Sequence, residues 1–147
     1  MIPPPVVALV LAGGMWAVER VSAHLAWAKP GRVVVASALF ALGVLCAASA
    51  AVAFRRWNTT INPHKPEESR SLVRSGPFRF TRNPMYLGLL TVLLGWAAWL
   101  GAPWSLLGPV VFFLYIQRFQ IAPEERVLVE KFGEEYQQYR RAVRRWL

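Results

Sequence analysis

The sequence has few of the residues that stabilise small proteins by cross-linking or by metal binding. It contains one cysteine, Cys46, and two histidines among 147 residues. A single thiol excludes an internal disulfide, and two histidines without a cysteine cluster do not supply the ligands of a structural zinc site. We therefore expect no metal and a fold that is held together by packing alone.

Acidic residues are also scarce: eight Asp and Glu stand against 17 Lys and Arg, for a formal net charge of +9. An excess of this size could indicate a nucleic-acid partner. Here, however, the basic residues flank long uncharged runs and form no separate basic domain. That pattern is typical of membrane topology and of contact with anionic lipid. We expect the lipid bilayer as a partner and no nucleic acid.

Apolar residues are abundant, at 55% of the chain, with seven Trp and eight Phe. A soluble domain of this size cannot bury so much apolar surface, because its surface is too large relative to its volume. Residues 33–54 carry no charge and would form a helix of about 33 Å. Residues 85–116 are also uncharged, and Gly101-Ala102-Pro103 supplies a turn near their middle. We predict an all-α integral membrane bundle of four transmembrane helices in one domain over 1–147, with spans at about 5–27, 33–54, 85–100 and 104–119.

Two polar segments complete this arrangement, a loop over 55–84 and a C-terminal amphipathic helix over 123–146. Pro123 suits the first turn of that helix, and apolar residues recur along one face at spacings of three and four. Seven Lys and Arg lie in 55–82 and seven more in 118–145, but only Lys29 and Arg32 lie in the first interhelical turn. The positive-inside rule then predicts a multi-pass protein with both termini, the loop and the C-terminal helix in the cytoplasm. In a bacterium the membrane would be the inner one.

The segment most suggestive of chemistry runs from Gly76 to Gly88 and reads GPFRFTRNPMYLG. Its Asn-Pro pair leads directly into an apolar helix, whose free amide groups favour anions, and its two arginines add positive charge. Glu124 and Glu125 follow the fourth predicted span on the same side. A basic, amide-rich loop that faces two carboxylates suits a zwitterionic ligand, although polarity alone does not single out one such ligand.

GPFRFTRNPMYLG, followed by PEERVLVEKFGEEYQQY, resembles the membrane methyltransferase family of isoprenylcysteine carboxyl methyltransferases and phospholipid methyltransferases. The resemblance covers about residues 61–146. It implies a helical membrane enzyme that binds S-adenosylmethionine at the cytoplasmic face. The methyl acceptor would be a membrane-associated amphiphile: a lipid amine, a prenylcysteine carboxylate or a hydrophobic thiol.

The resemblance also implies roles for particular residues. It gives catalytic roles to Arg82, Tyr86 and Glu125. It gives cofactor-binding roles to Leu72, Val73, Gly76, Pro77, Phe78, Arg79, Asn83, Pro84, Tyr86, Gln120, Glu124 and Glu125.

Two positions depart from the pattern that the resemblance leads us to expect. Asn83 stands where the best-known members have a histidine, and asparagine cannot act as a base. Gln120 stands where enzymes that act on a prenylcysteine carboxylate have an arginine, although Arg118 is near. The loss of a two-pronged carboxylate clamp weakens the case for a carboxylate acceptor. The alternative to an enzyme is a non-catalytic membrane scaffold or a small-molecule binder with the same fold.

Several charged residues outside the motifs have no assigned role. Glu19, Arg20 and His24 fall in the distal part of the first predicted span, where we favour a role at the membrane surface. Whether His64, in the central loop, takes part in catalysis stays open. The arginines at 140, 141, 144 and 145 are interpreted as a basic tail attracted to anionic lipid.

Overall fold

The computed structural model describes residues 2–21, 29–56 and 72–147, and within these ranges every regular element is a helix. The expected all-α class is thereby confirmed. His24 and His64 lie outside the described residues. The elements in chain order are α1 (Pro4–Glu19), α2 (Lys29–Arg56), η2 (Gly76–Arg79), α3 (Pro84–Leu100), η3 (Pro103–Leu106), α4 (Leu107–Ile116), η4 (Gln117–Ile121) and α5 (Ala122–Ala142).

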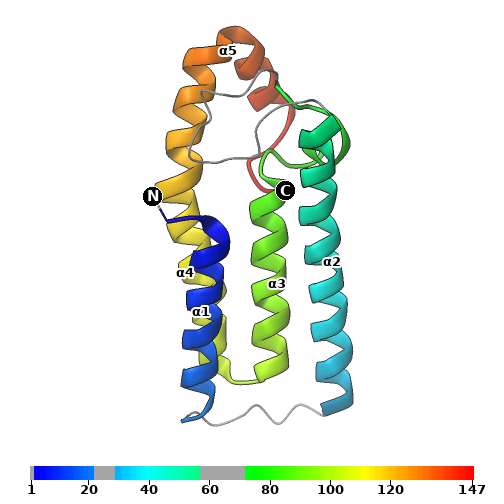
Figure 1. Cartoon of the computed structure of the whole chain (residues 1–147), viewed down its shortest axis with the longest axis vertical. Coiled ribbons are helices and arrows are strands. Elements are labelled where there is room, and N and C mark those ends of the chain that lie inside the picture. The colour runs from blue at the N-terminus through cyan, green and yellow to red at the C-terminus, as the bar shows by residue number, and fades with distance from the viewer. Residues whose placement is uncertain (1, 22–28, 57–71) are drawn as a thin grey trace.

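The long helices run side by side around α3 (Figure 1). Helix α2 packs along α3 more extensively than any other described pair of elements, and α1 contacts both α3 and α4. Helix α5 continues from α4 past the end of the bundle, and the chain then folds back so that its C-terminal end lies near the start of α3. This return brings the last residues to the Asn-Pro motif.

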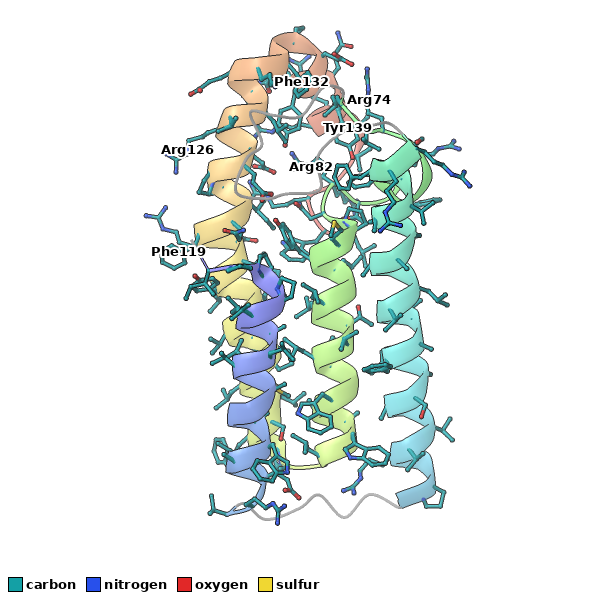
Figure 2. The ribbon with its side chains drawn as sticks, viewed as in Figure 1. Arg74, Arg82, Phe119, Arg126, Phe132 and Tyr139 are labelled. Atoms are coloured by element: carbon teal, nitrogen blue, oxygen red, sulfur yellow. The ribbon has the colours of Figure 1, made fainter. Side chains whose placement is uncertain are left out.

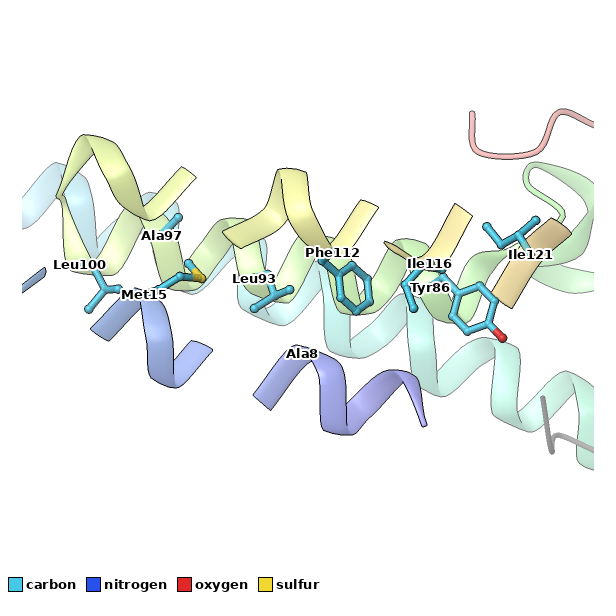
Figure 3. Packing of buried hydrophobic residues seen from close by; sticks show 9 residues of the cluster. All are labelled: Ala8, Met15, Tyr86, Leu93, Ala97, Leu100, Phe112, Ile116 and Ile121. Atoms are coloured by element: carbon cyan, nitrogen blue, oxygen red, sulfur yellow. The ribbon is translucent and has the colours of Figure 1, made fainter. Parts of the chain in front are cut away.

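The interior of the bundle is apolar and so is most of its outer surface. One buried cluster runs along the bundle axis (Figure 3), made of Ala8, Met15, Tyr86, Leu93, Ala97, Leu100, Phe112, Ile116 and Ile121. Large apolar side chains on the outside stay exposed, as for Leu9 at 72% and Leu45 at 67%. Two helices, Pro30–Arg56 and Pro103–Ala142, are long and apolar enough to cross a membrane, whereas α1 and α3 are apolar but shorter.

Small residues bring α2 and α3 into direct backbone contact. A Cβ atom added at Gly88 would lie 2.6 Å from the carbonyl oxygen of Gly43 and 2.8 Å from the amide nitrogen of Ala47. Both neighbours are backbone atoms, so they cannot move without shifting the helix. The two helices can approach this closely only because Gly43 and Gly88 both lack a side chain.

The substitution Gly88→Ala is expected to destabilise the bundle by about 1–3 kcal/mol, because the added methyl group must force α2 and α3 apart. Gly13→Ala on α1 is the matched control, since nothing lies within 4 Å of its added Cβ atom. The control should be neutral or stabilising by up to about 1 kcal/mol, as alanine is the better helix former. Thermal unfolding of the two variants in detergent measures the difference, and equal melting temperatures would contradict the close contact.

Three predicted segments have different bounds in the structure. Helix α1 ends at Glu19, so Glu19 and Arg20 lie at a helix end. Residues 22–28 of the predicted span are outside the described part. Helix α2 covers 29–56, beyond the predicted 33–54. The helix predicted over 123–146 is not a separate element, because α4, the π-helical turn η4 and α5 are continuous.

That last helix also ends earlier than predicted. Gly133 has a positive φ of 51° and interrupts the helical backbone, and Val143 is extended with φ −126° and ψ 131°. The physical reason for the early end is that the next residues form hydrogen bonds with the Asn-Pro motif instead of continuing the helix.

Candidate active site

The loop before α3 is anchored on the end of α2. Val73 and Phe78 are buried in a second apolar cluster with Ala50 and Ala53. The Phe78 ring also packs edge-on against Phe54, with 5.0 Å between ring centroids. These contacts hold the loop in place. The side chains of Val73 and Phe78, both predicted to bind the cofactor, are buried in this apolar cluster, so only their backbone atoms could contact a ligand.

The C-terminal tail, residues 143–147, forms hydrogen bonds with the Asn-Pro motif. The amide of Arg82 donates to the carbonyl of Arg144 at 3.0 Å. The carbonyl of Arg145 accepts from Asn83 Nδ2 at 2.9 Å and from Thr81 Oγ1 at 3.2 Å. The backbone amide of Arg82 and the side chains of Thr81 and Asn83 therefore donate to backbone carbonyls of this same chain.

Aromatic side chains attach the tail and α5 to the bundle. Trp146 Nε1 donates to Gln117 Oε1 at 3.1 Å, and the Trp146 ring packs on Phe113 with 4.9 Å between centroids. The hydroxyl of Tyr139 donates to the carbonyl of Phe78 at 2.7 Å. Figure 2 shows Tyr139 and Arg82 in this region, between α5 and the start of α3, whereas Arg126 points away from it. The loop, α5 and the tail thus form one connected unit.

Glu125 lies at the centre of this unit and is paired with two arginines. Its side chain is 10% exposed. Arg145 binds it with two prongs, at 2.6 Å and 3.1 Å, and Arg82 Nη1 lies 3.0 Å from Oε1 although out of line for a hydrogen bond. The hydrogen bond with Glu125 raises the pKa of Arg145, so its charge is retained. Burial, followed by the charge of Glu125, raises the pKa of the adjacent Tyr136 to about 12, which keeps that phenol neutral.

The interpretation of the C-terminal arginines as a lipid-attracted tail is therefore wrong for Arg145, whose guanidinium faces Glu125. The early end of α5 turns Arg145 inward. Arg140, Arg141 and Arg144 are exposed, as that interpretation requires.

Glu124 lies next to this ion-paired cluster, and none of the described Lys or Arg residues forms an ion pair with it. The hydroxyl of Tyr86, from the first turn of α3, donates to Glu124 Oε1 at 2.6 Å. Burial raises the pKa of Glu124 to about 7; the hydrogen bond from Tyr86 opposes this shift and the nearby charge of Glu125 adds to it. A partly buried carboxylate held by one neutral donor is suited to receive a cationic group.

Gln120 lies beside this pair and has unsatisfied polar atoms. It is 1% exposed, and neither its side-chain oxygen nor its side-chain nitrogen has a hydrogen-bond partner among the described residues. It approaches the Tyr86 hydroxyl without forming a hydrogen bond to it. Buried amides without partners are rare in folded proteins because each costs about 1–3 kcal/mol. Gln120 belongs to the π-helical turn η4, a feature that recurs at functional sites and that the sequence did not reveal.

The structure thus brings together most of the predicted site residues at one end of the bundle. Arg79 is exposed on η2, and no ion pair joins it to either carboxylate. Arg118, suggested as a replacement for the missing arginine, is also exposed, whereas Gln120 is buried. The remaining predicted residues lie in the loop and at the start of α3: Leu72 is half-buried, Gly76 has φ 60°, the Pro77 carbonyl accepts from Phe80 and Thr81, and Pro84 is buried.

Sequence reasoning missed two of the residues that hold this site together, Arg145 and Tyr136. Tyr136 lies in the second quoted segment but was given no role, and Arg145 was interpreted only as part of the basic tail. In the described part of the chain, no three His, Cys, Asp or Glu residues are grouped so as to hold a metal ion.

Several known proteins are similar to parts of this chain. The family model described as phospholipid methyltransferase matches residues 31–135. An uncharacterized protein of Haemophilus influenzae is 54% identical over 63 residues, which are 43% of this chain and 100% of that protein. Protein-S-isoprenylcysteine O-methyltransferase of Schizosaccharomyces pombe is 32% identical over 111 residues, which are 70% of this chain and 46% of that protein. Methanethiol S-methyltransferase 1 of Bradyrhizobium diazoefficiens is 41% identical over 66 residues, which are 45% of this chain and 22% of that protein.

The chain spans less than half the length of the two relatives named as methyltransferases. No solved structure matches it significantly. The family model, however, covers well over half of the chain and includes the loop, the Asn-Pro motif, Gln120 and both glutamates. The resemblance identified in the sequence is thereby confirmed: the chain belongs to the phospholipid methyltransferase family.

Proposed function

We propose that this protein transfers the methyl group of S-adenosylmethionine to a membrane-associated amphiphilic acceptor, and that the cofactor occupies the space beside Tyr86, Gln120 and Glu124. The observation that carries the proposal is the buried amide of Gln120, which has no hydrogen-bond partner among the described residues and lies beside Glu124, a carboxylate that no described Lys or Arg neutralises. The cofactor supplies a methyl group on a sulfonium centre, and it has an ammonium group and a carboxylate of its own. The residues present fit such a ligand, because Glu124 offers a negative charge to a cationic group and the Gln120 amide offers a donor and an acceptor to polar atoms.

In this proposal only Glu124, of the two glutamates expected to bind the cofactor, contacts its cationic end. Glu125 is already neutralised by Arg82 and Arg145, so a further cation would have to compete with two arginines. Within the part of the chain that the structure describes, Glu124 receives one hydrogen bond, from Tyr86, and forms no ion pair. Tyr86 orients the Glu124 carboxylate, and Gln120 donates to or accepts from polar atoms of the ligand. The ion pairs of Glu125 with Arg82 and Arg145 hold the loop and the tail in place. The enzyme's main task is to align the acceptor and exclude water, so no catalytic triad is required.

The proposed setting is a membrane that four helices cross, with the site and both termini at the cytoplasmic face. The support is the apolar outer surface of the bundle and the distribution of Lys and Arg, of which few lie at the end remote from Glu124. Helices α1 and α3 would be about 24 Å and 26 Å long for 16 and 17 residues. A short bundle thins the local bilayer, which would bring a lipid acceptor closer to the site.

The acceptor belongs to one of the classes suggested by the relatives. Their names point to a phospholipid, an isoprenylcysteine carboxylate and methanethiol. Gln120 in place of an arginine favours an amine or a thiol over a carboxylate. Purified protein incubated with methyl-labelled S-adenosylmethionine and total membrane lipid should transfer label to one lipid species. If no label is transferred and S-adenosylhomocysteine does not bind at micromolar concentration, the protein is a scaffold and the proposal fails.

The affinity for S-adenosylhomocysteine is expected to rise about tenfold from pH 6 to pH 8, since a carboxyl group with a pKa near 7 becomes ionised over this range. The stability has the opposite dependence. A raised pKa means that the folded state holds its proton more tightly than the unfolded state, so Glu124 should lower stability as the pH rises from about 4.5 to about 7. Calorimetric titrations at pH 6, 7 and 8 measure the affinity. If the affinity of the Glu124→Gln variant still rises with pH, another group causes the pH dependence.

A further inference from the structure

A polar pocket lies at the end of the bundle opposite to the proposed active site. The proposed reaction does not use it. It has a volume of about 640 Å³ and is lined by Trp16, Glu19, Arg20, Arg32, Val33, Trp96, Trp99 and Leu100. These residues come from the end of α1, the start of α2 and the end of α3, which meet at the end of the molecule remote from α5 (Figure 1). The volume is in the range of small-molecule sites.

Both arginines of this pocket are held in place by their surroundings. A Cβ atom added at Gly101 would lie 2.1 Å from Arg32 Nη1, so the guanidinium rests directly on the backbone of the turn that ends α3. The guanidinium of Arg20 lies over the ring of Trp16, 4.6 Å from its centroid. Trp96 is fixed as well, because its Nε1 donates to the carbonyl of Ala12 at 3.0 Å. Groups fixed in this way bind a ligand with little loss of conformational entropy.

The chemistry of the lining indicates the kind of ligand. Two guanidinium groups and one carboxylate give a net positive charge, and the planar donors of arginine match a phosphate group. Trp16 and Trp99 are about half exposed, at 48% and 49%, as in the aromatic belts that lie at the level of lipid headgroups. The neighbouring outer face of α2 is apolar, with Val34 67% exposed, and offers a path for an acyl chain.

We propose that this pocket binds the phosphate group of a membrane phospholipid. The proposal rests on the membrane setting described above but not on methyl transfer, so a failure of either can be recognised without the other. The lipid would hold α1, α2 and α3 together at the end of the bundle remote from Glu124.

The test titrates the full chain in detergent with short-chain phosphatidylglycerol and follows tryptophan fluorescence. Parallel titrations use inorganic phosphate and short-chain diacylglycerol. We expect saturable binding of phosphatidylglycerol, weakened about tenfold or more in the double variant Arg20→Gln/Arg32→Gln. The matched control Arg55→Gln/Arg56→Gln removes the same charge from exposed positions at the other end of α2 and should bind as the parent does. The single variant Arg32→Lys keeps the charge but loses the planar donors, so it should weaken phosphatidylglycerol binding severalfold. This variant provides the test if the double variant does not fold, and unchanged affinity in it would contradict the role of Arg32.

Three results would overturn the proposal. If diacylglycerol binds as tightly as phosphatidylglycerol, the pocket does not recognise the phosphate group. If both double variants lose the same affinity for phosphatidylglycerol, the effect comes from the net charge of the protein and not from this pocket. Inorganic phosphate bound as tightly as the lipid would show a phosphate site without a lipid ligand.

Discussion

The substitution Glu124→Gln is expected to weaken binding of S-adenosylmethionine about 10- to 100-fold, with little change in stability. Glutamine keeps the shape of the side chain and can still accept the hydrogen bond from Tyr86, but it removes the negative charge. A hydrogen bond to a charged group contributes about 1.5–3 kcal/mol. Because burial already raises the pKa of Glu124, loss of its charge should not destabilise the fold. Calorimetric titration of the purified chain measures the affinity.

Comparison of two ligands makes this experiment more specific. S-adenosylmethionine has a sulfonium and S-adenosylhomocysteine does not, whereas both have an ammonium group. A larger loss for S-adenosylmethionine would place Glu124 at the sulfonium, and equal losses would place it at the ammonium. Glu130→Gln, at an exposed position further along α5, removes the same charge and should leave both affinities unchanged. Unchanged affinity in Glu124→Gln would remove that residue from the site.

Glu125→Gln is expected to cost about 3–5 kcal/mol of stability, because it leaves the charges of Arg82 and Arg145 without their partner. The side chains of Glu125 and Arg82 are each 10% exposed, so water screens this pair poorly. The matched control is Glu135→Gln, which breaks the ion pair with Arg74 at a site where both side chains are nearly half exposed. Surface pairs of this kind contribute about 0–1 kcal/mol. Denaturant unfolding in detergent measures both variants.

A second substitution tests the reason for that loss. If the cost arises from unpaired charge, replacing Arg82 by Met in the Glu125→Gln background should restore part of the stability, since one of the two uncompensated cations is then removed. A loss no larger than in the Glu135→Gln control would show that Glu125 is not needed to hold the loop and the tail.

The sequence predicted those features that depend on composition and on local chemistry. The uncharged runs predicted the helices. The turn predicted at Gly101 is present, and this glycine ends α3 with a left-handed φ of 71°. The Asn-Pro motif and the two glutamates were expected on the same side of the bundle. Asn83 and Glu125 both contact Arg145, so they do lie at the same end.

The rest depended on contacts that no local pattern encodes. The pairing of Arg145 with Glu125 requires α5 to end at Ala142, and the end of the helix is fixed by hydrogen bonds to Thr81 and Asn83, more than 60 residues away in the sequence. The distinction between the two adjacent glutamates could not be predicted either, since both are the same residue type in the same turn. Their different partners arise only when the tail folds back.

The π-helical turn η4 constrains the length of the chain between the bundle and the two glutamates. A π turn contains one residue more than an α-helical turn, and each residue rotates a helix by about 100°. Removal of one residue between Gln117 and Ile121 would leave α4 packed as before but would rotate Glu124 and Glu125 to another side of the helix. For this reason a one-residue gap in η4 should be rarer among relatives that keep both glutamates than a substitution at the same place.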